Sequence, residues 1–102
     1  MKPAATVNLD PVRIRKAVDI LKSVAHPARL AVIELLSDNE EMSVGAIQSY
    51  LKIEQSLLSH HLMILRENGI VACRRDGKSI RYRLAERNLL RVLECISSCC
   101  AQ

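Results

Sequence analysis

The spacing of apolar residues changes near Gly69, and that change limits the possible folds more than any other feature of this chain. Before Gly69 the apolar residues recur every three or four positions, which is typical of amphipathic helices. Two short β-prone runs follow, residues 70–75 and 79–84, on either side of Asp76-Gly77. An Asp-Gly pair between two such runs is a strong β-hairpin signal. Helical spacing then returns over residues 86–100, so the sequence predicts a mainly α fold with one small hairpin.

Capping residues and prolines divide the first two thirds of the chain into four helices. An Asp-Pro pair supplies an N-cap and a proline for the first helical turn, and a second proline ends that helix and opens the next. Ser43 caps the third helix, and a short turn at Lys52-Ile53 separates it from the fourth. The predicted helices are residues 11–24, a helix opening at Pro27, a helix capped by Ser43, and residues 55–68 with Gly69 as the C′ glycine.

With 102 residues, the chain is expected to form one domain, residues 10–102, preceded by a loose arm at residues 1–9. A domain this small has a modest core, so association with a second copy would add stability. The sequence has no Trp, no Phe and only two Tyr, which argues against stacking-based binding of single-stranded nucleic acid. It also lacks a signal-peptide pattern and a membrane-length apolar run, so a cytoplasmic location without membrane contact is expected.

The charged residues are distributed unevenly along the chain, whose formal net charge is +4. Residues 74–91 contain seven basic side chains and two acidic ones, whereas residues 34–41 are acidic. A one-sided basic region of this kind indicates a polyanionic partner at one end of the molecule.

The third and fourth predicted helices form a helix-turn-helix, and the fourth helix has two different sides. At about 100° per residue, one side carries Leu58, Leu62 and Leu65, and the residues expected beside them are Leu57, His61 and Ile64. The opposite side, near the start of the helix, carries uncharged hydrogen-bonding side chains and no carboxylate. Such side chains suit base edges in a major groove, and free N–H groups at the helix start suit a phosphate. The residues predicted to face DNA are Gln55, Ser56, Ser59 and His60.

The predicted hairpin supplies basic side chains beside this helix. A basic β-ribbon next to a recognition helix forms a wing, which reaches the DNA backbone or the minor groove. Contacts with phosphates add affinity rather than sequence choice. The predicted wing contacts are Arg74, Arg75, Lys78 and Arg81.

Four stretches of the chain together resemble the ArsR/SmtB family of winged helix-turn-helix regulators. They are residues 24–30 (VAHPARL), 51–62 (LKIEQSLLSHHL), 65–71 (LRENGIV) and 74–84 (RRDGKSIRYRL). The combination of Gln-Ser-x-x-Ser-x-His-Leu with the Arg-Asp-Gly-Lys wing is more specific than a bare helix-turn-helix, and the resemblance covers about residues 15–95.

This resemblance implies a homodimer joined through its first and last helices. It also implies repression at a palindromic operator in double-stranded DNA until a ligand binds. Gln55, Ser56, Ser59 and His60 match positions that face bases and phosphates in the family. His61 matches the family's histidine before leucine, and it is interpreted as structural because its side of the helix faces the core.

Two metal sites found in the family are not expected here. The Cys-x-Cys pair of the third helix is replaced by Ser43 and Gly45, and the last helix contains no histidine. The three histidines of the chain are His26, His60 and His61, and their spacing does not indicate a metal cluster.

Three cysteines lie within six residues near the end of the chain. Helical residues four apart share a face, and thiolates bind soft ions such as arsenite, cadmium or zinc. The cluster also suits thiol oxidation or persulfide chemistry, and the plainer alternative is apolar packing in a dimer seam. Cys73, in the hairpin, is interpreted as a packing residue. The candidate thiol sensor, with a thiophilic metal(loid) ion as candidate ligand, is Cys95, Cys99 and Cys100.

Several alternatives remain open from the sequence. One is a repressor without a metal site, controlled by oxidation, persulfide or another protein. Others are a protein-interaction winged helix that has lost operator binding, and a thiol-based metal buffer. An enzyme is not expected, because the sequence offers no acid–base pair and no phosphate-binding glycine loop.

Overall fold

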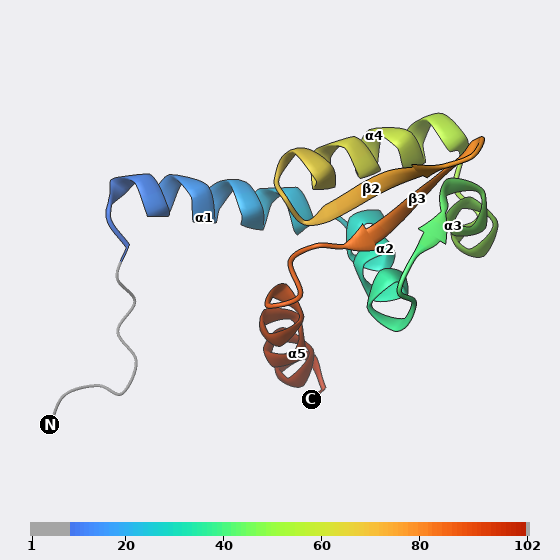
Figure 1. Ribbon diagram of the computed structural model, residues 1–102. Helices are drawn as coiled ribbons and strands as arrows, with labels where there is room; N and C mark the ends of the chain where they lie inside the picture. Colours follow the sequence, from blue (N-terminus) through green and yellow to red (C-terminus); the bar gives the residue numbers. More distant parts are fainter. Residues whose placement is uncertain (1–8, 102) are drawn as a thin grey trace, which may run out of the picture.

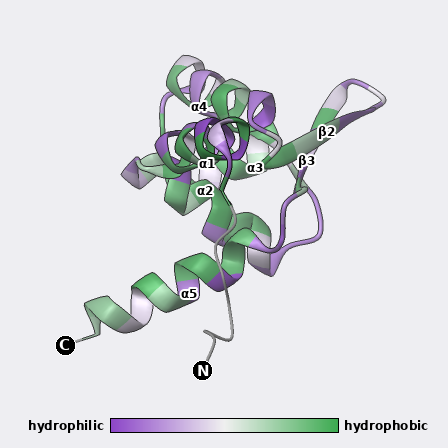
Figure 2. Ribbon diagram, turned by 90° about the vertical axis from the view of Figure 1, so that its left-hand side faces the viewer, coloured by the Kyte–Doolittle hydropathy of each residue, from purple (hydrophilic) through white to green (hydrophobic). Residues whose placement is uncertain are grey.

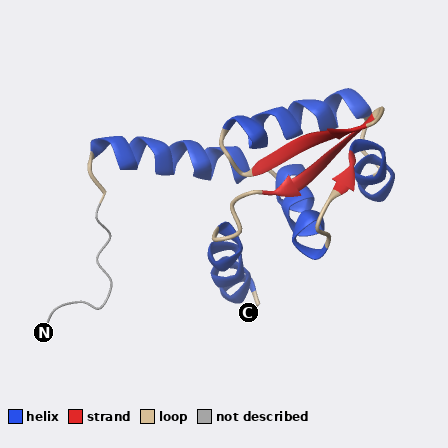
Figure 3. Ribbon diagram, in the orientation of Figure 1, coloured by secondary structure: helices blue, strands red, loops and turns tan. Residues whose placement is uncertain are grey.

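The computed structural model describes residues 9–101, which form five helices and three strands (Figures 1 and 3). In order they are α1 (Pro11–Val24), α2 (Pro27–Asp38), β1 (Met42–Ser43), α3 (Val44–Leu51), α4 (Gln55–Glu67), β2 (Val71–Asp76), β3 (Ser79–Leu84) and α5 (Leu89–Cys100). The predicted order of four helices, a hairpin and a last helix is confirmed. The predicted arm falls almost entirely on residues 1–8, which lie outside the described residues.

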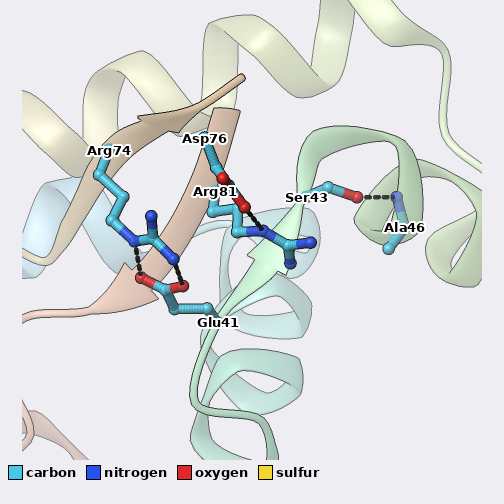
Figure 4. Close-up of polar contacts among 6 residues, drawn as sticks. All are labelled: Glu41, Ser43, Ala46, Arg74, Asp76 and Arg81. Carbon is cyan, nitrogen blue, oxygen red and sulfur yellow. Dashed lines mark hydrogen bonds and ion pairs between the residues drawn. The ribbon is translucent and has the colours of Figure 1, made fainter. Parts of the chain in front are cut away.

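The capping residues expected from the sequence begin and end these elements. The Asp10 carboxylate accepts from the Arg13 N–H at 2.9 Å, and the Ser43 hydroxyl accepts from the Ala46 N–H at 3.1 Å (Figure 4). Gly69 and Gly77 have φ angles of +74° and +66°, a conformation that side chains disfavour. These glycines therefore end α4 and close the hairpin turn as predicted.

The hairpin belongs to a three-stranded antiparallel sheet with the order β1-β3-β2 (Figure 3). In the hairpin Arg74 pairs with Arg81, while β1 adds Met42 opposite Tyr82. The short β1 strand was not predicted, because two residues carry no periodic signal and their partner lies 40 positions away in the sequence. Its consequence is that the hairpin is attached to the segment that begins α3.

The core lies between α2, α3, α4 and the base of the hairpin. Leu58, Leu62 and Leu65 of α4 are at most 1% exposed, as their side of the predicted helix requires. Leu57, which was expected beside them, is 47% exposed, so that part of the prediction is wrong. The fully buried residues from other elements include Val32, Ile33, Leu36, Ile47 and Ile70.

Helices α1 and α5 extend from the body away from the tip of the hairpin (Figures 1 and 2). Of the 14 residues of α1, only Ser23 and Val24 are buried, and α5 buries only Leu89. The last helix begins at Leu89 rather than at residue 86, because the N–H of Leu89 first bonds the carbonyl of Glu86 in a turn. No helix in residues 9–101 is long and apolar enough to cross a membrane.

Candidate nucleic-acid interface

A groove of about 660 Å³ separates the exposed side of α4 from the hairpin. The α4 side chains in its wall recur every three or four residues, from Gln55 to Arg66, which places them along one side of the helix. Gln55 and Ser59 near the beginning of α4 and Lys78 at the hairpin turn line this same groove, so both elements face one region. The residues that line the groove include Gln55, Ser59 and Arg66 from α4 and Lys78, Ile80 and Tyr82 from the hairpin.

The residues predicted to face DNA do not all lie in this groove. Gln55 and Ser59 line it, whereas Ser56 lies just outside it and donates its hydroxyl to the Glu54 carboxylate. His60 is exposed, and its ring lies 5.9 Å from that of His61. The structure therefore brings together half of the predicted reading face, and the other half extends along the outer side of α4.

The two faces of the hairpin carry different sets of arginines. Side chains alternate along a strand, and directly paired residues share a face. Arg75 pairs with Ile80, which lines the groove, so Arg75 belongs to the face that α4 approaches. Arg74 pairs with Arg81 on the opposite face.

Arg74 and Arg81 on this opposite face have carboxylate partners (Figure 4). Arg74 bonds both carboxylate oxygens of Glu41 at 2.8 Å, and Arg81 bonds Asp76 at 3.0 Å. The hydrogen bond from Arg74 lowers the pKa of Glu41 and raises that of Arg74 itself. The acidic segment before α3 thus contacts the basic hairpin, which corrects the expectation of two separated charged ends. Among residues 9–101, neither Arg75 nor Lys78 has an ion pair.

A carboxylate occupies the beginning of α4, where free N–H groups were predicted. Glu54 is the N-cap, and its side chain accepts from the Leu57 N–H at 3.1 Å and from the Ser56 hydroxyl. These hydrogen bonds lower the pKa of Glu54, the one from Ser56 most, so the side chain is charged at neutral pH. The expectation that this helix end is free to bind a phosphate is therefore wrong in part.

Removing the charge of this cap tests whether α4 approaches phosphates with its first turn. Glu54→Gln keeps an oxygen that can accept from Leu57 but removes the like charge, so affinity for random DNA should rise roughly threefold at low salt. Fluorescence anisotropy would measure it, with Glu67→Gln, the same change at the other end of α4, as the control. If both variants and the parent protein bind random DNA with equal affinity, the first turn of α4 does not approach the phosphates.

Sequence reasoning did not select Arg66, although its wheel position on the exposed side of α4 was available. The structure places Arg66 in the groove, where its guanidinium donates to the Cys73 sulfur at 3.3 Å. Cys73 is half-buried beside Tyr82, and burial raises the pKa of the Tyr82 hydroxyl. Cys73 of β2 therefore contacts α4 through Arg66, and Arg66 adds a cation to the groove.

Comparison with known proteins identifies the family. The model described as "Bacterial regulatory protein, arsR family" matches residues 26–72. A biofilm growth-associated repressor from Agrobacterium fabrum is 44% identical over 84 residues, which make up 82% of this chain and 71% of that protein. The chain belongs to the ArsR family.

Solved structures of ArsR-type regulators share this fold. HlyU from Vibrio cholerae superimposes with a TM-score of 0.78 at 34% identity, covering 91% of this chain and 100% of that one. BigR, a transcriptional repressor from Xylella fastidiosa, gives a TM-score of 0.78 at 37% identity, with 89% and 93% covered. The winged helix-turn-helix prediction is confirmed, and the family consists of transcriptional regulators rather than enzymes.

The cysteines of α5 in this ArsR-family chain are all exposed. At about 100° per residue, Cys95 and Cys99 share a side of α5 with Val92 and Ile96, which are 44% and 51% exposed. Cys100 lies nearer the side of the partly buried Leu93. Within residues 9–101, no group of three His, Cys, Asp or Glu side chains could hold a metal ion.

Proposed function

We propose that this protein is a dimeric, sequence-specific repressor that acts in the cytoplasm on a palindromic operator. The groove between α4 and the hairpin carries this proposal, because it combines uncharged hydrogen-bonding groups with cations that lack carboxylate partners. In a dimer, two copies of α4 would enter successive major grooves about 34 Å apart. Gln55 and Ser59 would contact base edges, and Arg75 and Lys78 would contact phosphates.

This division of roles predicts different effects of single substitutions. Gln55→Ala or Ser59→Ala should weaken operator binding by about 1–3 kcal/mol while leaving random DNA nearly unaffected. Arg75→Ala should weaken both kinds of binding and reduce the slope of log affinity against log salt by about 1. Anisotropy titrations with DNA from upstream of the gene and with a scrambled duplex would measure both. Equal losses on the two duplexes for all three variants would contradict the assignment.

Apolar side chains without a partner support the dimer. On one side of α1, Ile14, Val18 and Leu21 are 39–54% exposed, and Val92 and Ile96 are exposed on α5. Beside them, α2 and α5 border an open groove of about 740 Å³ with Leu30 and Leu93 in its wall. Helices that are amphipathic but little buried within their own chain are covered when copies associate. We assign this face to a homodimer formed through α1 and α5.

Repression is the proposed direction of control. The relatives from Agrobacterium fabrum and Xylella fastidiosa are named repressors, whereas the Vibrio cholerae relative is named a transcriptional activator. The physics of operator binding is the same in both cases, and the position of the operator relative to the promoter decides the outcome. A reporter driven by the upstream region should become more active when the gene is deleted, and a fall in its activity would indicate activation.

A thiol signal at α5 is the proposed means of release. Cys95 and Cys99 are exposed, and they share a side of α5 with the apolar residues assigned to the dimer face. Modification or metal binding there would alter the packing of the two copies and hence the spacing of α4. Capping the thiols of the reduced protein should lower its operator affinity, and Cys→Ser replacement at positions 95, 99 and 100 should abolish the response. A response that survives the triple replacement would assign these cysteines to packing.

A further inference from the structure

The side chain of Arg29 links three helices. Arg29, on α2, donates its Nε–H to Nδ1 of His61 on α4 at 3.0 Å. Its Nη1 donates at 3.2 Å to the carbonyl of Ser23, in the last turn of α1. The planar guanidinium presents its donors in a fixed fork, so two bonds from one group constrain the direction of both partners.

The chemistry of His61 fits an acceptor role better than a packing role. The residue is 2% exposed, and its Nε2 has no hydrogen-bond partner. Because Nδ1 accepts from Arg29, the neutral ring must carry its proton on the unpaired Nε2. A buried unpaired donor costs stability, which an apolar side chain of similar size would avoid. Burial, followed by the nearby charges of His26, Arg29 and His60, lowers the pKa of His61 and keeps Nδ1 available as an acceptor.

The linked helices have different places in the proposed function, on which this inference rests. The α1 helix belongs to the proposed dimer face, and α4 carries the side chains that line the groove. The His26 ring lies 4.5 Å from His61 and caps α2 by accepting from the Ala28 N–H, so the start of α2 is fixed at the same point. A change in the direction of α1 would therefore reach α4 through Arg29.

We propose that Arg29 is a positioning residue that sets the orientation of α4 relative to α1 through its hydrogen bond to His61. Arg29 is thereby a determinant of operator discrimination although it is not in the groove. Binding to an operator requires both copies of α4 to fit at once, so it depends on that orientation. Binding to random DNA depends chiefly on phosphate charges, which the contact does not change.

Three variants separate positioning from charge and from stability. Arg29→Lys keeps the charge but loses the fork, and His61→Leu keeps an apolar filling but loses the acceptor. His61→Asn can place an amide oxygen near the position of Nδ1 and should restore the contact. Arg87→Lys, in the exposed turn before α5, is the matched control. We expect Arg29→Lys and His61→Leu to lower the ratio of operator to random-DNA affinity about tenfold, with His61→Asn and Arg87→Lys close to the parent protein.

Anisotropy on both duplexes at one salt concentration gives this ratio, and thermal unfolding shows that each variant is folded at the assay temperature. Residual dipolar couplings of the free protein report the angle between α1 and α4 without DNA. We expect Arg29→Lys to change that angle. An unchanged angle with an unchanged ratio would overturn the proposal, as would equal losses in His61→Asn and His61→Leu. A parent protein that does not prefer its operator would refute the proposed function instead, and the angle measurement would still decide the role of Arg29.

Discussion

Replacing Ile96 by glutamate should convert the protein to monomers and lower its operator affinity by about 100-fold or more. Ile96 is 51% exposed on the side of α5 that also carries Val92. In the proposed dimer a carboxylate at this position would be buried without a partner, which is costly. The large effect on DNA follows because a monomer contacts one half-site and loses the advantage of two linked binding events.

A control on the same helix separates loss of the interface from the added charge. Ser98 lies two residues beyond Ile96, about 200° around the helix, and it is exposed. Ser98→Glu adds the same charge away from the apolar side, so it should remain dimeric. Sedimentation velocity gives the oligomeric state, and anisotropy gives the operator affinity. A dimer that persists in Ile96→Glu would place the interface elsewhere.

The exposure of α1 gives this prediction its physical basis. An isolated helix of 14 residues is marginally stable in water, and α1 buries only Ser23 and Val24 within its own chain. Its apolar residues nevertheless recur at helical spacing, so its sequence specifies a buried side that the single chain does not provide. In the proposed dimer, a second copy would cover this side of α1.

Local signals in the sequence predicted most of the elements. Asp10, Ser43 and Gly69 act through bonds or backbone angles within a few residues of themselves, so each could be recognised without the fold. The Asp76-Gly77 turn is equally local, and it fixed the register of the hairpin. The predicted start of α5, at residue 86, is wrong, because residues 86–88 form a turn before the helix begins at Leu89. The backbone hydrogen bonds of this turn resemble those of a first helical turn.

Long-range pairs explain what the sequence did not predict about the site. Arg74 and Glu41 are 33 residues apart, and Arg29 and His61 are 32 apart, so no local pattern connects them. For the same reason the ion pair between the acidic segment and the basic hairpin was not predicted. The groove residues Gln55 and Ser59 were found because a helical wheel needs only the helix, whereas Arg66 needed the position of the hairpin to be recognised.

Replacing Leu58 by alanine should reduce the free energy of unfolding by about 2–5 kcal/mol. Leu58 is fully buried on α4, so truncation removes apolar contacts and leaves a cavity at the centre of the helix-turn-helix. Leu57→Ala, at the adjacent and 47% exposed position, has the same chemistry and should cost less than about 1 kcal/mol. Urea unfolding of both variants at one protein concentration would measure the difference. The free energy of unfolding of a domain is only about 5–15 kcal/mol, so a loss of this size should leave part of the Leu58→Ala protein unfolded at 37 °C and lower its DNA binding. Equal stability of the two variants would mean that α4 does not pack as the structure shows.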